Sequence, residues 1–226
     1  MLNDWNTIDI DSALGFLDSC RRYEGGFAQR PHLEANAGPT YCAIAAYHLS
    51  GRLPQLEAQD SLLRWLLARQ VHPSPPSSPS EPSSSSDDED QDEHEPSTLL
   101  PFESCAGFQG RTNKPLDACY SFWNLAALRL LVPNDLESLI DPTLNTTFLL
   151  HCQHPQFGGI AREPKAMPDI MHTYLSLAAL SIENSSSNHY NREEEEPCRR
   201  LAELDVAWNV EVKVANRFRD KIAALQ

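Results

Sequence analysis

The sequence predicts an all-α fold made of stacked helical hairpins, and three observations carry this prediction. A motif with fixed internal offsets recurs three times, in segments that begin near residues 26, 107 and 159. More polar segments with apolar residues at helical spacing lie between these repeats. No segment shows the sustained apolar–polar alternation of a half-buried β-strand. These features together indicate a helical repeat protein.

Each repeat begins at a glycine and keeps the same residue types at the same distances from it. The starting pairs are Gly26-Phe27, Gly107-Phe108 and Gly159-Ile160. Fourteen residues after each glycine lies a hydroxyl residue, then an aromatic residue, then a pair of alanines four positions later. The members are Thr40, Tyr41, Ala45 and Ala46; Ser121, Phe122, Ala126 and Ala127; and Thr173, Tyr174, Ala178 and Ala179. This pattern predicts a glycine turn, a short loop and a helix whose alanines allow close packing.

Six helical segments are expected. The alanine pairs place inner helices at 38–50, 116–132 and 169–182, and amphipathic segments are expected at 11–22, 56–70 and 139–153. The chain, 1–226, is expected to form one folded unit apart from two polar segments. Residues 71–99, rich in serine, proline and acid, lack the apolar surface to offset the entropy of ordering, so we expect disorder there. Residues 184–197 are expected to form a loop.

The net charge of −14 is concentrated in one segment. Residues 72–101 hold eight acids and no lysine or arginine, which leaves 24 acids against 18 bases elsewhere and argues against nonspecific nucleic-acid binding. No apolar run reaches the ~18 residues of a transmembrane segment. The acidic N-terminus is unlike a secretory signal, so a cytoplasmic location is expected. The six cysteines form no C-x-x-C pair and are expected to be buried thiols or isolated ligands.

Asp117, Cys119 and His172 are candidate metal ligands. A single D-x-C pair also fits a helix N-cap beside a buried thiol. The repeat register, however, aligns His172 with Tyr120, the neighbour of Cys119, and stacked inner helices would bring these positions together at one end. One oxygen, one sulfur and one nitrogen ligand leave the fourth position of a tetrahedral zinc open, as a catalytic site requires. An incoming thiol could bind there and lose its proton.

A cationic loop precedes these candidate ligands. Arg111 and Lys114 lie six and three residues before Asp117 in the segment GRTNKPLDACY. Surface bases are most often only solvated, but these lie at a helix start, where backbone N–H groups also favour anions. With the hydroxyl of Tyr120 they are suited to hold a diphosphate and to stabilise its charge as it leaves.

Three segments resemble the β subunits of protein prenyltransferases: LEANAGPTYCAIAAYHLSG, GRTNKPLDACYSFW and GGIAREPKAMPDIMHTYLSLAALS. The resemblance runs over residues 21–182, apart from the acidic segment. It implies an α-α toroid around an apolar, aromatic-lined funnel, and a heterodimer with a helical α subunit. Family members are longer, so the toroid is expected to be incomplete on its N-terminal side.

The resemblance also implies roles for individual residues. The implied ligands of a single zinc are Asp117, Cys119 and His172, and the implied diphosphate contacts are Arg111, Lys114, Tyr120 and Arg162, with Asn36 where the family usually has histidine. The implied isoprenoid pocket contains Tyr41, Cys42 and Trp123. Plain core packing is the alternative for Trp123. Asp169 is either an orienter of His172 or an ordinary helix-start acid.

Arg162, ten residues before His172, separates the branches of the family. Farnesyl and Rab-type members have aspartate there, which in the farnesyl members helps to hold magnesium on the diphosphate, whereas type I geranylgeranyl members have a base. The resemblance therefore implies transfer from geranylgeranyl diphosphate to the cysteine of CaaX proteins such as small GTPases, with zinc and without magnesium.

Three alternatives stay open at this point. The chain could be the β subunit of a farnesyltransferase, or a truncated, inactive paralogue that acts only as a helical scaffold. A squalene-type terpene cyclase shares the helical rings, but it needs an aspartate-rich acid motif. The only run of aspartates here lies in the segment expected to be disordered.

Overall fold

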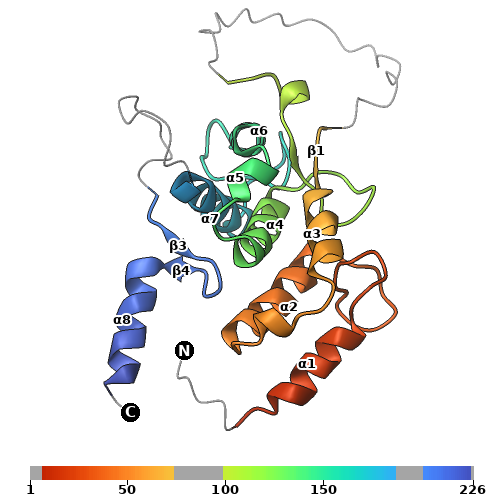
Figure 1. The fold of residues 1–226 in the computed structure, drawn as a ribbon. Coiled ribbons are helices and arrows are strands. Elements are labelled where there is room, and N and C mark those ends of the chain that lie inside the picture. Colours follow the sequence, from red (N-terminus) through yellow and green to blue (C-terminus); the bar gives the residue numbers. More distant parts are fainter. Residues whose placement is uncertain (1–6, 74–98, 187–200, 225–226) are drawn as a thin grey trace, which may run out of the picture.

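The computed structural model describes residues 7–73, 99–186 and 201–224, and this part of the chain is helical (Figure 1). The inner helices are α2 (Ala37–Leu49), α4 (Ala118–Leu131) and α7 (Ile170–Ser186). The other helices are α1 (Ile10–Ser19), α3 (Gln59–Leu67), α5 (Leu136–Leu139), α6 (Pro142–His151) and α8 (Val212–Ala223), with 3-10 turns η1 (Leu53–Gln55) and η2 (Phe102–Ser104). Two antiparallel hairpins pair β1 (Gln70–Val71) with β2 (Gly107–Phe108) and β3 (Leu204–Asp205) with β4 (Val210–Glu211). The all-α prediction is confirmed.

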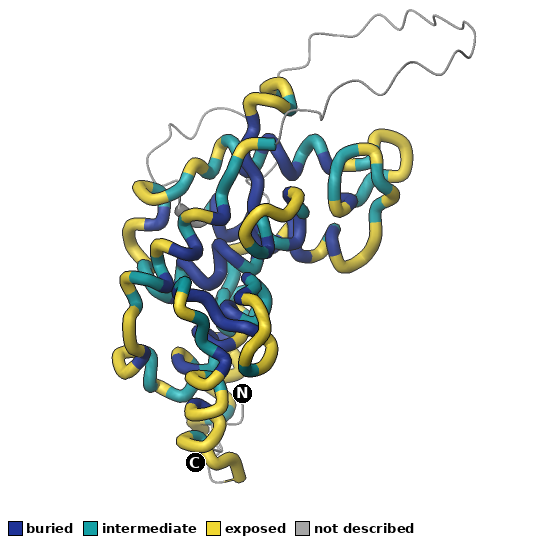
Figure 2. The backbone as a smooth tube through the Cα atoms, turned by 90° about the vertical axis from the view of Figure 1, so that its right-hand side faces the viewer, coloured by how far each residue is buried: buried dark blue, intermediate teal, exposed yellow. Residues whose placement is uncertain are grey.

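Helix α4 forms the centre of the core because it packs against α2 on one side and α7 on the other (Figure 1). Its side chains Phe122, Leu125 and Leu128 are fully buried, and its alanine pair allows the close approach that the repeat predicts. Outside this layer, α1 packs on α2, α3 on α4, and α6 on α4 and α7. Buried segments run through the middle of the molecule, whereas loops and much of α8 are exposed (Figure 2). None of the described helices has the length and apolar character needed to cross a bilayer.

The six expected helical segments are all observed, with ends that differ from the expected ones by up to four residues, and α8 has no expected counterpart. Helix α7 continues to Ser186, so it includes the first residues of the expected polar loop, and residues 187–197 of that loop lie outside the described part. Helix α6 begins only at Pro142. Asp141 caps it, its carboxylate accepting a hydrogen bond from Leu144 N at 3.0 Å, and proline suits the first helical position.

The segment expected to be disordered overlaps the folded part at its N-terminal end. Val71 pairs with Gly107 in the β1–β2 hairpin, and His72 Nδ1 lies 2.8 Å from the carbonyl oxygen of Cys105. The folded chain therefore extends past the expected boundary at residue 71. Residues 74–98 lie outside the described residues, and disorder there stays a prediction.

The hydroxyl residue of the repeat clamps the inner helix to the preceding glycine turn. Thr40 Oγ1 accepts a hydrogen bond from Phe27 N at 2.9 Å, and Thr173 Oγ1 accepts from Ile160 N at the same distance. In the middle repeat, Ser121 Oγ instead donates to Asn145 Oδ1 at 2.8 Å. The first and third repeats thus share the same polar contacts between the hydroxyl and the glycine turn, and the second repeat uses its hydroxyl to contact α6.

We expect Thr40→Val to lower the free energy of unfolding by about 1–3 kcal/mol, because the buried N–H of Phe27 would lose its acceptor. Thr40→Ser keeps the hydroxyl and should retain more of the stability. Urea unfolding of the two variants and the unchanged protein measures the difference. Equal midpoints for the valine and serine variants would show that this hydrogen bond does not stabilise the repeat.

The C-terminal segment, for which the sequence carries no helical repeat, packs on the inner helices. Tyr41 Oη donates to Val206 O at 2.7 Å, and Tyr174 Oη donates to Asn209 O at 2.9 Å. These two tyrosines occupy the same repeat position on α2 and α7. They therefore tether the β3–β4 hairpin to the aromatic side of the inner layer, and α8 follows from that hairpin.

Candidate metal centre and anion pocket

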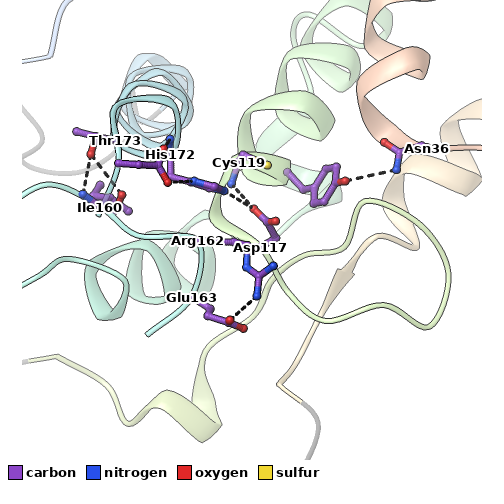
Figure 3. A network of polar contacts seen from close by, with 10 residues as sticks. Asn36, Asp117, Cys119, Ile160, Arg162, Glu163, His172 and Thr173 are labelled. Atoms are coloured by element: carbon purple, nitrogen blue, oxygen red, sulfur yellow. Dashed lines mark hydrogen bonds and ion pairs between the residues drawn. The ribbon is translucent and has the colours of Figure 1, made fainter. Parts of the chain in front are cut away.

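Helices α4 and α7 start at the same end of the inner layer, and this brings Asp117, Cys119 and His172 together (Figure 3). Asp117 is the N-cap of α4, and its Oδ1 accepts a hydrogen bond from Cys119 N at 3.0 Å. Cys119 and His172 lie in the first turns of α4 and α7, and both are buried. The capping role considered for Asp117 is confirmed, and it coexists with the position that a metal ligand requires.

The ligand atoms of these three residues all lie within 4.8 Å of one another. His172 Nε2 is 3.3 Å from Asp117 Oδ1. Asp169 holds the other side of the ring, with Oδ2 at 2.5 Å from His172 Nδ1 and Oδ1 accepting from His172 N at 2.9 Å. Hydrogen bonds from the backbone and side chain of His172 keep the pKa of Asp169 below its ordinary value. Asp169 therefore orients His172 with Nε2 toward the other two candidate ligands.

This donor set fits zinc. A tetrahedral zinc with bonds of roughly 2.0–2.3 Å holds its ligand atoms roughly 3–4 Å apart, so the three side chains need only small adjustments to bind it. Burial, followed by the neighbouring carboxylate of Asp117, raises the pKa of the Cys119 thiol. A cation is thus needed to stabilise the thiolate, and metal binding would release the thiol proton.

A pocket of about 180 Å³ adjoins the candidate metal centre and shares Asp117 with it. It is lined by Gly110, Arg111, Lys114, Pro115, Leu116, Asp117, Tyr120 and Arg162. The three cations and the phenol expected to contact diphosphate are therefore brought to one place. Arg162 is tied to the start of α4 through its main chain, because its carbonyl accepts a hydrogen bond from Ala118 N at 2.9 Å.

The loop over this pocket passes very close to Tyr120. A Cβ atom built on Gly110 would lie 2.0 Å from Cζ of the Tyr120 ring, so only glycine fits there. The carbonyl of Gly110 also accepts from Ala37 N at 2.8 Å, which ties the loop to the start of α2. Asn36 caps α2 by accepting from Gly38 N, and its Nδ2 lies 3.4 Å from Tyr120 Oη (Figure 3). Asn36 thus contacts the hydroxyl of Tyr120, which lines the pocket, and does not line the pocket itself.

Both arginines of the pocket have carboxylate partners in this structure. Arg111 pairs with Glu34 and Arg162 with Glu163, each at 2.5 Å. These pairs are partly exposed, and solvent screening makes such contacts easy to exchange for a multiply charged anion. Within the described residues Lys114 has no carboxylate at ion-pair distance, so its ammonium is available to an anion.

The candidate isoprenoid residues lie further along the inner helices. The ring of Tyr41 lies 5.3 Å from that of Phe122 and 5.4 Å from that of Trp123, between centroids. Cys42 is exposed on α2. Burial raises the pKa of Tyr41 to about 12, in keeping with a phenol that donates to Val206 O. The aromatic cluster is thus formed, and the C-terminal hairpin that sequence reasoning missed lies against it.

The family model for the prenyltransferase alpha-alpha toroid domain matches residues 1–210. The chain belongs to this family. The solved structure of Candida albicans protein geranylgeranyltransferase-I complexed with GGPP superimposes with a TM-score of 0.71 and 28% identity. It covers 98% of this chain, which in turn covers 53% of that one. The toroid prediction is confirmed.

Curated relatives of the toroid family refine the comparison. The geranylgeranyl transferase type-1 subunit beta of Dictyostelium discoideum is 38% identical over 188 residues, covering 83% of this chain and 43% of that protein. The Arabidopsis thaliana subunit of the same type is 33% identical and covers 80% and 42%. The farnesyltransferase subunit beta of Schizosaccharomyces pombe is 30% identical and covers 76% and 39%. The chain spans less than half the length of these relatives, and the predicted resemblance to type I β subunits is confirmed.

Proposed function

We propose that this chain forms the zinc-binding part of the β subunit of a type I protein geranylgeranyltransferase. The observation that carries the proposal is the convergence of an oxygen, a sulfur and a nitrogen ligand beside a pocket with three cations. The similarity to type-1 β subunits supports it. The proposed reaction moves a geranylgeranyl group from its diphosphate to the cysteine thiol of a protein ending in Cys-a-a-X, with leucine or phenylalanine favoured at X.

Asp117, Cys119 and His172 would hold one zinc, and Asp169 would keep the imidazole of His172 oriented toward it. Zinc bound there supplies the positive charge that lowers the pKa of a substrate thiol, so that the thiolate is present at neutral pH. The start of α4 delivers two of the three ligands within its first turn. The position of the substrate cysteine is therefore set by the helix that also borders the anion pocket.

Arg111, Lys114 and Arg162 would bind the diphosphate, with the hydroxyl of Tyr120 as a further donor and Asn36 behind it. The thiolate sulfur forms a bond to C1 of the prenyl chain while the bond from C1 to the diphosphate oxygen breaks. The electron pair of the broken bond leaves with the diphosphate, whose growing negative charge these donors stabilise. Tyr41, Cys42 and Trp123 are proposed to border the isoprenoid.

The proposed partners follow from the same family. We propose a helical prenyltransferase α subunit as the heterodimer partner, CaaX proteins such as small GTPases as protein substrates, and the cytoplasm as the location. Both type-1 relatives are named as β subunits, which supports a second subunit for this chain. Apolar side chains are exposed on α7, among them Ile170 and Met171, and such a surface is suited to contact with another polypeptide.

The type I assignment predicts turnover with zinc but without added magnesium, because the guanidinium of Arg162 supplies the charge that a hard cation would supply. Arg162→Asp should slow prenyl transfer in the absence of magnesium, and added magnesium should restore much of the rate because a carboxylate can bind it. The measurement is a magnesium titration of the rate, with the chain paired with an α subunit and with both prenyl diphosphates as donors.

Arg162→Gln is the matched control, since it removes the same charge but offers no carboxylate, and magnesium should not rescue it. Strong magnesium dependence of the unchanged enzyme, or a preference for farnesyl diphosphate, would favour a farnesyltransferase instead. Absence of transfer in a folded, zinc-loaded heterodimer would favour the inactive scaffold.

A further inference from the structure

Arg69 is a buried arginine behind the loop that carries Arg111 and Lys114. It follows α3 and is only 6% exposed. Its Nε donates to Trp65 O at 3.1 Å, and its guanidinium carbon lies 4.9 Å from the centre of the Trp65 ring. Its Nη1 donates to Thr112 Oγ1 at 2.9 Å. The side chain therefore reaches from the end of α3 into the cationic loop.

In the part of the chain that the structure describes, the charge of Arg69 has no close counter-ion. Among the described residues no carboxylate lies within ion-pair distance of it, and the nearest electrostatic influences are the more distant Glu24 and Glu34. Burial lowers the pKa of Arg69, which reflects the cost of taking the guanidinium out of water. A buried cation of this kind raises the positive potential of its surroundings. The surroundings here include Thr112, the chain neighbour of the pocket residue Arg111.

The main chain of Arg69 also supports this loop. Its carbonyl accepts a hydrogen bond from Gln109 N at 2.9 Å, and Gln109 forms a β-bridge with Leu116. The two ends of the loop, Gln109 and Leu116, therefore pair with each other next to the carbonyl of Arg69. The side chain of Arg69 bonds Thr112 in the middle of the same loop. Asn113, the next residue, has a left-handed φ of 56°. Such a conformation is sparsely populated without support from its surroundings.

We propose that Arg69 is a positioning residue of the anion pocket. It holds the loop through Thr112 so that Arg111 and Lys114 face a bound diphosphate, and its own charge adds to the attraction. The identity of the anion as a diphosphate rests on the proposed function. A fixed loop binds more tightly than a mobile one because less side-chain and loop entropy is lost when the anion arrives.

Thr112→Val tests the grip on the loop, because valine keeps the shape of threonine and removes the acceptor oxygen. Thr112 is exposed, so the change should leave the core intact. Calorimetric titration of the full chain with inorganic diphosphate should show affinity about tenfold weaker for the valine variant, the factor that about 1.4 kcal/mol represents. Thr112→Ser, which keeps the oxygen, is the matched control and should bind as the unchanged protein does. Zinc content and the thermal midpoint should be the same in all three.

A triple variant, compared with its double-variant background, separates positioning from general stabilisation. If Arg69 acts through the loop cations, Thr112→Val should cost little further affinity once Lys114→Gln and Arg111→Gln are already present. An undiminished loss in that background would overturn the proposal. Unchanged affinity in both Thr112→Val and Arg69→Lys would also overturn the proposal, since a lysine ammonium cannot reproduce the guanidinium's hydrogen bonds to both Trp65 O and Thr112 Oγ1.

The outcomes also separate this proposal from the proposed function. Diphosphate binding that depends on Thr112 and Arg69, in a heterodimer that transfers no prenyl group, would support the positioning role and overturn the enzymatic one. Absence of diphosphate binding by the unchanged protein would overturn both.

Discussion

Replacing Cys119 or His172 by alanine is expected to remove stoichiometric zinc from the protein. The unchanged chain should bind about one zinc, because three side chains supply one oxygen, one sulfur and one nitrogen ligand. Loss of one ligand leaves two, and two side chains together with water hold zinc far more weakly. Metal analysis after gel filtration measures the stoichiometry, and circular dichroism checks that the helices are retained.

Cys152→Ala is the matched control for this experiment. Cys152 is a buried free thiol like Cys119, but it caps the C-terminal end of α6 and lies outside the cluster of candidate ligands. It should lose some stability and keep its zinc. Full zinc in both Cys119→Ala and His172→Ala would show that the ligands are other residues. Loss of zinc in the Cys152 variant would show that the measurement reports unfolding instead.

Glu183→Gln is expected to make the stability of the protein less dependent on pH. Glu183 is a buried carboxyl on α7, where it accepts hydrogen bonds from Asn145 Nδ2 at 2.8 Å and Thr146 Oγ1 at 3.0 Å. Asn145 in turn accepts from Ser121 Oγ, so the network joins α4, α6 and α7. Burial raises the pKa of Glu183 from 4.5 to about 8.

The direction of the effect follows from proton binding. Between about pH 4.5 and about pH 8 the folded protein keeps the proton of Glu183 while the unfolded chain has lost it. The free energy of unfolding therefore falls as the pH rises, by about 1.4 kcal/mol per pH unit from this group. Glutamine has the same shape, can accept from Asn145 and donate to Thr146, and binds no proton. Its stability advantage over glutamate should grow to several kcal/mol by about pH 8.

Urea unfolding from about pH 5 to about pH 8 measures this difference, and the other titrating groups cancel between the two proteins. Glu103→Gln is the control, because Glu103 is exposed and should leave the pH profile unchanged. Parallel profiles for Glu183→Gln and the unchanged protein would mean that Glu183 titrates normally in the folded state.

The spacing of residues within each repeat predicts the turns and the inner helices. The register between repeats predicts that the candidate metal ligands meet at one end of these helices. The glycine turns, the hydroxyl clamp and the alanine pairs act within about twenty residues of each other, so their spacing predicts turn and helix without knowledge of the rest. The equivalent register of Tyr120 and His172 then predicts that Cys119 and His172 meet. The structure brings these side chains together as expected.

The middle repeat shows where such reasoning stops. Ser121 occupies the clamp position, yet it donates to Asn145 instead of accepting from the glycine turn. Asn145 and Glu183 come from two other helices, and nothing in the local pattern around Ser121 identifies them. A buried polar side chain needs a hydrogen-bond partner, and the packing of the helices decides which residue that partner is. The spacing of residues along the sequence does not identify it.

The sequence by itself determined the helical class, the repeat register, the cationic loop and the three candidate ligands, because each depends on residues near one another or on a repeated offset. Only the tertiary structure placed Arg69 behind Thr112 and the β3–β4 hairpin on Tyr41 and Tyr174. These contacts join segments that are separated along the chain or that belong to no repeat. They arise from the way the helices pack, and no periodicity in the sequence reports them.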